Sequence, residues 1–386
     1  MRAVHPGRAA APALLALTLG LASAACGSDD DGAAGGDASG ARTVEVALTD
    51  AGCEPAKLDL QAGATTFKVT NKGTGRVSEF EVKQGDRILG EVENVSAGLE
   101  RSFSLNLKQG TYVLACPGGT SAAEGTLTVG AAGAAAGGQA AAELTAAADR
   151  YRTYVQAQTA VLVARTRELA AAVTAGDVAA AKQRYVPARI PYERIEPVAE
   201  SFGDLDPAID AREGDVPAAE WGGFHRIEQA LWVKGTTQGM APVARKLLAD
   251  VTRLQGLVRT VELDAPQIAN GANELLGEVS KSKITGEEER YSHTDLVDFK
   301  ANLDGSRAAF DAVRPALDKL DGDLAGRIQQ RFDATDQALV SYQQGQLGSY
   351  VSYDRLDDPD KRTLSQSIDA LAEPLSLVSA KLAAGG

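Results

Sequence analysis

Residues Gly130 to Gly138 read Gly-Ala-Ala-Gly-Ala-Ala-Ala-Gly-Gly, and this stretch separates two parts of the chain with different patterns. A run of glycine and alanine has no side chain large enough to build a core, so it is typical of a linker. Before it, residues 42–129 alternate apolar and polar side chains in short runs such as Thr-Val-Glu-Val-Ala-Leu. After it, residues 142–386 repeat apolar side chains at the helical period. We therefore place a linker at residues 130–141, between two domains.

The two periods predict two classes of fold. A period of two, interrupted by turn residues, favours six or seven strands in a small β-sandwich. The helical period predicts an all-α bundle, with a first helix over residues 143–173. A second helix is expected to begin at Asp177 and to be kinked or broken by Pro187, Pro191 and Pro197. The prediction is a multidomain β + α protein, an N-terminal β-sandwich followed by a helical bundle.

The first 25 residues have the layout of a secretory signal peptide. Arg2 and Arg8 precede an apolar stretch from Ala11 to Ala25, which is too short and wrongly flanked to span a membrane. The run Leu21-Ala-Ser-Ala-Ala-Cys26 resembles a bacterial lipobox, in which the cysteine is lipidated; plain secretion is the alternative. Residues 26–41 then indicate a flexible tether. We expect an exported protein, lipid-anchored through Cys26 to the outer face of the cytoplasmic membrane.

The charge of the chain argues against one class of partner. The formal net charge is −13, and it becomes −15 once Arg2 and Arg8 leave with the signal peptide. The acidic residues are spread along the sequence, and no basic stretch could displace the counterions of a phosphate backbone. We expect no nucleic-acid partner, and an acidic exterior that attracts cations.

Only two histidines follow the signal peptide, and both lie among acidic and aromatic residues. Three clusters combine histidine or carboxylate side chains at short spacing: Glu193 with Glu196, His225 with Glu228, and His293 with Asp295. Residues three apart on a helix share a face, so the two side chains of such a pair can reach one ion. Imidazole and carboxylate are ligands of first-row transition metals, and helical bundles hold metals with similar pairs. The clusters predict one metal site in the bundle core.

Two other interpretations of these clusters stay open. The first is that they are surface ion pairs, for example Glu193 with Arg189 and Asp298 with Arg307, beside a core histidine. The second is a metallopeptidase, because a histidine followed three residues later by a glutamate is similar to part of a zinc-hydrolase motif. The zinc-protease signature His-Glu-x-x-His does not occur in the sequence, so hydrolysis is the weaker hypothesis.

The β part has two cysteines, Cys53 and Cys116, near opposite ends of its sequence. An exported domain with two cysteines most often joins them in a disulfide. The alternative is a metal site in which the two thiolates act with the carboxylates of Glu79 and Glu81. A blue-copper site is excluded, because such a site needs two histidines and residues 42–130 contain neither histidine nor methionine.

Longer segments of the sequence resemble the EfeO family. In the β part, Cys53-Glu-Pro, Glu79-Phe-Glu81 and Tyr112-Val-Leu-Ala-Cys116 resemble its cupredoxin-like domain. In the helical part, the segments 192–200, 223–228 and 290–299 resemble its imelysin-type domain; they read YERIEPVAE, GFHRIE and RYSHTDLVDF. The resemblance covers both domains, from about residue 42 to the C-terminus.

This resemblance implies the extracytoplasmic iron-binding component of a ferrous-iron uptake system, which works beside a membrane iron permease and a secreted haem-dependent peroxidase. It implies iron, as Fe2+ or Fe3+, at a helical-domain site with the residues Glu193, Glu196, His225, Glu228, His293 and Asp295. It implies a β-domain site at Cys53, Glu79, Glu81 and Cys116, which could take copper or a second iron. The family carries a peptidase label, but the missing hydrolase signature leads us to expect a binding protein. A metal-free scaffold for the permease and the peroxidase remains a further alternative.

Overall fold

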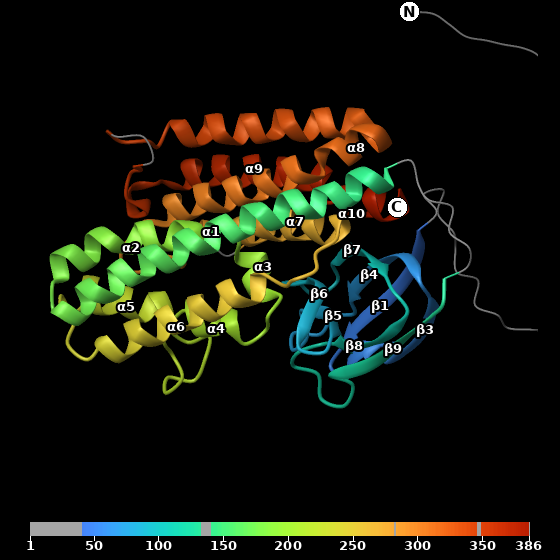
Figure 1. The fold of residues 1–386 in the computed structure, drawn as a ribbon, viewed down its shortest axis with the longest axis horizontal. Helices are drawn as coiled ribbons and strands as arrows, with labels where there is room; N and C mark the ends of the chain where they lie inside the picture. Colours follow the sequence, from blue (N-terminus) through green and yellow to red (C-terminus); the bar gives the residue numbers. More distant parts are fainter. Residues whose placement is uncertain (1–40, 133–139, 282, 346–348, 386) are drawn as a thin grey trace, which may run out of the picture. The chain divides into compact units, whose positions relative to one another are not determined.

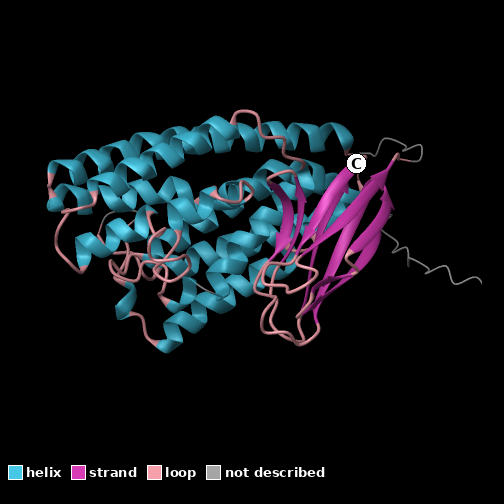
Figure 2. Cartoon of the chain, turned by 90° about the horizontal axis from the view of Figure 1, so that it is seen from below, coloured by secondary structure: helices cyan, strands magenta, loops and turns pink. Residues whose placement is uncertain are grey.

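The computed structural model describes residues 41–132, 140–281, 283–345 and 349–385. The expected signal peptide, the lipidation site Cys26, nearly all of the tether and most of the linker lie outside the described residues. Strands occupy the N-terminal part and helices the C-terminal part, and the two are segregated (Figures 1 and 2). The structure confirms the predicted fold class, a β-sandwich followed by a helical domain.

Nine strands of the described part form the two sheets of the sandwich. The order in the first sheet is β2 (Gly52–Glu54), β1 (Arg42–Thr49), β4 (Gly63–Asn71) and β7 (Glu100–Leu107). The order in the second sheet is β3 (Lys57–Gln61), β9 (Glu124–Gly130), β8 (Gly110–Ala115), β5 (Phe80–Gln84) and β6 (Arg87–Val92). Strand β1 is parallel to β4 and β3 is parallel to β9, whereas the other pairs are antiparallel.

Alternation along the strands fills the space between the sheets. Phe67 of β4, Phe80 of β5 and Phe103 of β7 are buried, and their ring centroids are 5.3 to 5.9 Å apart. Because successive strand residues point to opposite faces, Glu81, next to Phe80, points away from this core. This alternation decides where the acidic side chains of the sandwich lie.

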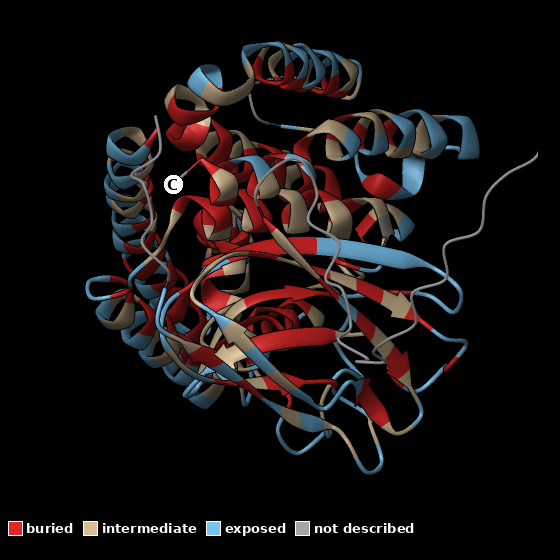
Figure 3. Cartoon of the chain, turned by 90° about the vertical axis from the view of Figure 1, so that its right-hand side faces the viewer, coloured by how far each residue is buried: buried red, intermediate tan, exposed pale blue. Residues whose placement is uncertain are grey.

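Ten α-helices lie in the described part of the C-terminal domain. They are α1 (Ala141–Ala175), α2 (Val178–Glu193), α3 (Glu196–Glu200), α4 (Leu205–Asp210), α5 (Gly223–Trp232), α6 (Ala241–Val258), α7 (Ala265–Lys281), α8 (Asp295–Val340), α9 (Asp358–Leu375) and α10 (Val378–Ala384). Asp177 caps α2 as the sequence predicts, because its carboxylate accepts a hydrogen bond of 2.9 Å from the N–H of Ala180. The buried sides of the helices face one another, and exposed residues lie on their outer sides (Figure 3).

Of the three prolines in the second predicted helix, only Pro197 coincides with a break. Pro187 and Pro191 lie inside α2, which ends at Glu193, and a new helix begins at Glu196 just before Pro197. Proline has no N–H and disfavours the helical conformation of the residue before it, so a break is expected there. The expected break is confirmed, but the pairing of Glu193 and Glu196 three residues apart on one helix face was wrong. They end one helix and begin the next.

Helix α7 joins the helical domain to the sandwich. The side chain of Asn270 donates a hydrogen bond of 2.9 Å to the carbonyl of Ser104, and that of Gln267 donates one of 3.0 Å to Leu89. The N–H of Ile88 donates to the carbonyl of Ser201, after α3. No described helix is long and apolar enough to cross a membrane.

Candidate metal centre

A fully buried arginine lies at the centre of the helical domain. Arg189 of α2 is 0% exposed, and its guanidinium lies over the ring of Phe224, 5.5 Å from the centroid. It forms ion pairs with five carboxylates from four segments: Glu193 of α2, Asp210 of α4, Glu288 and Glu289 of the loop before α8, and Asp298 of α8. A buried arginine can be stable only when its charge is paired and its N–H groups are bonded, which these carboxylates achieve.

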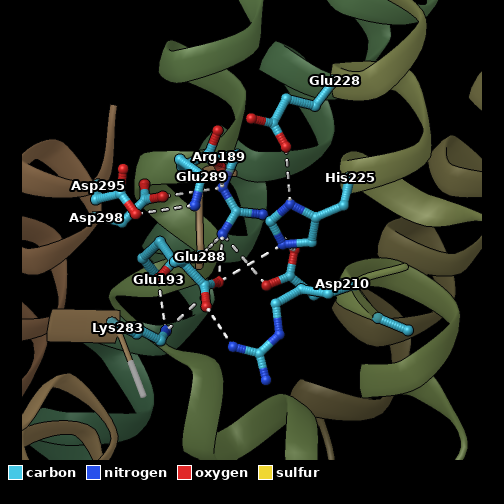
Figure 4. A network of polar contacts seen from close by, with 12 residues as sticks. Arg189, Glu193, Asp210, His225, Glu228, Lys283, Glu288, Glu289, Asp295 and Asp298 are labelled. Carbon is cyan, nitrogen blue, oxygen red and sulfur yellow. Dashed lines mark hydrogen bonds and ion pairs between the residues drawn. The ribbon is translucent and has the colours of Figure 1, made fainter. Parts of the chain in front are cut away.

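His225 of α5 lies beside this arginine with both ring nitrogens facing carboxylates (Figure 4). Its Nδ1 is 3.2 Å from an oxygen of Glu228, one helical turn along α5. Its Nε2 is 3.5 Å from Asp210 Oδ1 and 3.6 Å from Glu288 Oε1, and it has no hydrogen-bond partner among the described residues. The ring is 1% exposed, so this nitrogen is a buried polar atom without a hydrogen bond.

Glu228 is held by the backbone as well as by the histidine. Its second oxygen accepts hydrogen bonds of 2.9 Å from the N–H of Tyr291 and 2.7 Å from that of Ser292. A carboxylate that fixes one imidazole nitrogen leaves the other free to bind a metal and sets its direction. In this geometry Glu228 orients His225.

A buried lysine extends the network toward α7. Lys283 is 4% exposed, and its ammonium lies 2.9 Å from Glu193 and 2.6 Å from Glu196. The amide of Asn302 donates to the same two carboxylates, at 3.2 and 3.1 Å. These contacts bring together the ends of the two helices that Pro197 separates.

The charges of these groups shift one another's protonation. Burial would raise the pKa of Asp210, but the charges of Arg189 and His225 outweigh burial and lower it. Burial would also raise the pKa of Glu288, but the charges of Lys283 and His225 hold it well below its usual value. Burial alone would lower the pKa of His225, but Asp210 raises it well above the usual value. Without a metal, therefore, the imidazole carries a proton between two charged carboxylates.

Histidine and carboxylate side chains around Arg189 are close enough together to hold a metal ion. Three sets of side chains have ligand atoms within 4.8 Å of one another: Asp210, His225 and Glu288; His225, Glu228 and Glu289; and Glu193, Glu196, Asp210 and Glu288. Carboxylate oxygen with one imidazole is a donor set that suits Fe2+ and Fe3+ and does not suit copper(I). A metal that entered would replace the proton of His225.

The structure places four of the six predicted helical-site residues in this network, with Asp295 buried beside it. Glu193, Glu196, His225 and Glu228 lie in the network. Asp295 is buried close by, where one oxygen accepts from the N–H of Glu289 and the other has no hydrogen bond within the described part of the chain. Burial, offset in part by that bond, raises the pKa of Asp295 to about 6.

His293 has a backbone role in the structure. Its φ of 56° places it in the left-handed region, its N–H donates to Glu289, and its carbonyl accepts from Tyr353. No hydrogen bond or ion pair among the described residues links its ring to His225. Its assignment as a metal ligand stays a prediction.

The sequence interpretation missed several residues of the site. The ion pair of Arg189 with Glu193, weighed as a surface feature, is completely buried. Asp298 pairs with Arg189, whereas Arg307 pairs with Asp333 and Asp336. Asp210, Lys283, Glu288 and Glu289 were not proposed. The consecutive acids Glu287 to Glu289, just before the His293 cluster, were a possible signal, but nothing local marks Lys283.

The predicted β-domain site is corrected by the structure. Cys53 and Cys116 form a disulfide and lie buried in the sandwich core with Phe80. A disulfide offers no thiolate, so the cysteines cannot act as the expected metal ligands in this state. Glu79 and Glu81 instead form an acidic group with Glu91 of β6, and Glu81 points away from the core that holds the sulfurs.

The comparison with known proteins identifies the family. The imelysin model matches residues 147–378, and the cupredoxin-like domain model matches residues 12–129. The iron uptake system component EfeO of Escherichia coli strain K12 is 39% identical over 342 residues, which cover 86% of this chain and 89% of that protein. The chain belongs to the EfeO family. EfeO of Shigella flexneri has the same identity and coverage.

A solved structure of an iron-regulated protein A precursor from Parabacteroides distasonis covers 62% of this chain and 95% of its own, with a TM-score of 0.49 and 14% identity. The EfeO relatives are named as components of iron uptake systems. Family membership therefore supports a role in iron uptake for this chain.

Proposed function

We propose that this protein captures iron at the cluster around His225 and delivers it to a membrane permease. The observation that carries the proposal is the buried Nε2 of His225, which has no hydrogen bond and faces Asp210 at 3.5 Å and Glu288 at 3.6 Å. Iron is the cargo of the site. The atoms that would hold it are this nitrogen and oxygens of the two carboxylates, with Glu228 fixing the ring from behind.

The charges around the site favour reversible binding of iron. Arg189 and Lys283 neutralise part of the acidic cluster without iron, so the empty site is stable. Glu193 and Glu196 lie beside it as further oxygen ligands, in line with the residues that the family resemblance implies. A site that exchanges protons for iron is expected to release iron when it is reprotonated.

The rest of the system belongs to the same proposal. We infer export, a lipid anchor at Cys26, a membrane iron permease as the recipient and a secreted haem-dependent peroxidase as a further partner. A tethered protein would stay near the permease while its folded domains bind iron in solution.

We propose a binding role rather than peptidase activity. A metallopeptidase needs an open metal position and space for a peptide next to it. His225, Glu228, Asp210 and Glu288 are each at least nine-tenths buried, which suits a small ion better than a polypeptide. Digestion of a broad peptide library with added zinc tests this view. Cleavage that requires the metal and is lost in Glu228→Gln would favour the peptidase.

The experiment that tests iron capture is anaerobic calorimetry with Fe2+. His225→Ala combined with Glu228→Ala should weaken binding at this site by at least about tenfold. Glu168→Ala is a matched control, because Glu168 is exposed on α1 and pairs only with Arg165 among described residues. Circular dichroism would confirm that the variants fold. Unchanged iron binding in the double variant would refute the site, and a wild-type protein that cannot be loaded with metal would support the scaffold alternative.

A further inference from the structure

A second acidic cluster lies where the sandwich meets the helices. We name Glu91 of β6, Glu200 of α3 and Glu274 of α7 the interface cluster. One carboxylate oxygen from each lies within 4.8 Å of the others. Glu79 and Glu81 approach Glu91 from the sandwich side, in a second group of the same kind. The three members come from segments far apart in the sequence, and only the tertiary structure assembles them.

The interface cluster lines a cavity that an ion can enter. The cavity has a volume of about 810 Å³, and its wall includes Glu91, Glu200, Glu274, Asn273 and Ser104. Exposed side chains such as Glu93 also line it, so it communicates with solvent. Ions can therefore reach the carboxylates without unfolding of either domain.

No basic side chain compensates this cluster. Within the described residues, no lysine or arginine forms an ion pair within 4.0 Å with Glu91, Glu200 or Glu274. Glu91 is 7% exposed, and the neighbouring carboxyl group of Glu79 is hydrogen-bonded to it. Burying an ionised carboxylate in this way is unfavourable unless a cation or a proton accompanies it.

A neighbouring side-chain amide also has an oxygen without a hydrogen-bond donor. The Oδ1 atom of Asn273, on the wall of the same cavity, is buried and accepts no hydrogen bond in the described part of the chain. Burial, followed by the charges of Glu93 and Glu278, raises the pKa of Glu274 to about 8. Several oxygen acceptors thus line one cavity. Arg101 and Lys381 also line it, but Lys381 pairs with Asp321, and neither forms an ion pair with the interface cluster in the described part of the chain.

We propose that Glu91, Glu200 and Glu274 form a second divalent-cation site, shared by the sandwich and the helices. Three carboxylates without nitrogen or sulfur favour a hard cation, and oxygen sites of this kind bind Mn2+, Mg2+, Ca2+ and Fe2+. The identity of the ion as Fe2+ rests on the proposed function. The existence of the site does not, because it follows from the uncompensated carboxylates.

A line of acidic side chains connects this site with His225. Glu278 follows Glu274 by one helical turn on α7, and its carboxylate lies 3.5 Å from the ammonium of Lys283. Lys283 in turn contacts Glu193 and Glu196 of the first site. The second site is therefore linked to the site around His225 by a chain of charged side chains that runs through Lys283.

The test compares the metal stoichiometry of four proteins. Mn2+, followed by electron paramagnetic resonance, and Fe2+ under anaerobic conditions are the probes. The full chain should bind two ions, and Glu200→Gln combined with Glu274→Gln should bind one. His225→Ala with Glu228→Ala should also bind one, but should lose the other ion. Glu373→Gln, an exposed glutamate on the same cavity wall, is the control and should bind two.

The outcomes separate the two proposals. If the Glu200/Glu274 variant keeps both ions, the second site is wrong, whatever the His225 variant does. If the His225 variant keeps both ions, the proposed function fails while the second site stands. Since glutamine removes charge with little change in size, the metal-free Glu200/Glu274 variant should melt at a higher temperature than wild type. A higher melting temperature with an unchanged stoichiometry would mean that these carboxyls only repel one another, and would overturn the proposal.

Discussion

The two acidic clusters differ in how their charge is balanced. Around His225, the carboxylates surround Arg189 and Lys283, which are both buried. At the interface cluster, Glu91, Glu200 and Glu274 have no such cation among the described residues. The first cluster is therefore stable when empty, whereas the second needs protons or an external cation.

This difference separates two uses of buried acids. A compensated cluster holds its geometry and offers a preformed site, because the ion pairs position every carboxylate. An uncompensated cluster stores repulsion that a cation can relieve. Similar acidic residues can thus select an ion at the compensated cluster and attract a cation at the uncompensated one.

Removing the central cation should have the largest effect. Arg189→Met leaves five buried carboxylates without their common partner, and we expect a loss of about 3–5 kcal/mol in the free energy of unfolding. Urea denaturation with a chelator present measures it. Arg165→Met, which breaks an exposed pair with Glu168, should cost less than about 0.5 kcal/mol. A loss below about 1 kcal/mol at Arg189 would show that the first cluster does not depend on its cation.

Removing the disulfide tests whether sulfur belongs to either cluster. Cys53→Ser with Cys116→Ser should lower the free energy of unfolding by about 2–5 kcal/mol. The number of bound metal ions should not change, because the sulfurs lie in the sandwich core and the acids face away from it. Loss of one metal equivalent in a folded variant would return the cysteines to the metal-binding set.

Neutralising one acid in each cluster should give effects of opposite sign. Glu288→Gln weakens contacts with Arg189 and Lys283 and should destabilise the metal-free protein by about 1.5–3 kcal/mol. Glu91→Gln removes a buried charge whose neighbours are also acids, and should stabilise it by about 1 kcal/mol at pH 9. Urea denaturation of both variants at that pH makes the comparison. Effects of the same sign would mean that the two clusters are balanced alike.

The smallest effect is expected at Asp206, which accepts a hydrogen bond from Tyr192 and pairs with no cation in the described chain. Burial and the charge of Asp210 raise the pKa of Asp206 from 3.8 to about 7. The folded state then holds a proton that the unfolded state releases near pH 4. Its contribution to stability is present below that pH and is lost as the pH rises through about 7.

Asp206→Asn cannot titrate, so its melting temperature should fall less than that of wild type between pH 5 and pH 9. We expect a difference of about 1–2 °C, measured by calorimetry of the metal-free proteins. Parallel curves for the two proteins would show that Asp206 is already ionised when folded.

Much of the fold could be predicted from local patterns. The change of period across the glycine-alanine stretch separated strands from helices, because each period buries one face of its own element. The pair His225 and Glu228 was found in the same way, since their spacing depends only on the geometry of one helix. The break after Glu193 was less certain, because three prolines lie close together and only one of them begins a new helix.

Contacts between distant segments could not be predicted. Arg189 meets acids from α2, α4 and α8 and from the loop before α8, and no local spacing marks this convergence. The choice between thiolates and a disulfide also depended on whether the two cysteines meet, at a separation of 63 residues. Sequence patterns describe the surface of one element, whereas these sites are formed where several elements pack together.

The sequence by itself determined the two domains, their fold classes and the histidine that the proposed site uses. The periodicity of apolar residues and the positions of rare residues such as histidine are properties of the sequence, so they can be recognised before the chain folds. The tertiary structure alone decided that Asp210 and Glu288 complete the His225 site, that Cys53 bonds to Cys116, and that Glu91, Glu200 and Glu274 meet. Burial and charge balance depend on neighbours in space, and those neighbours exist only after folding.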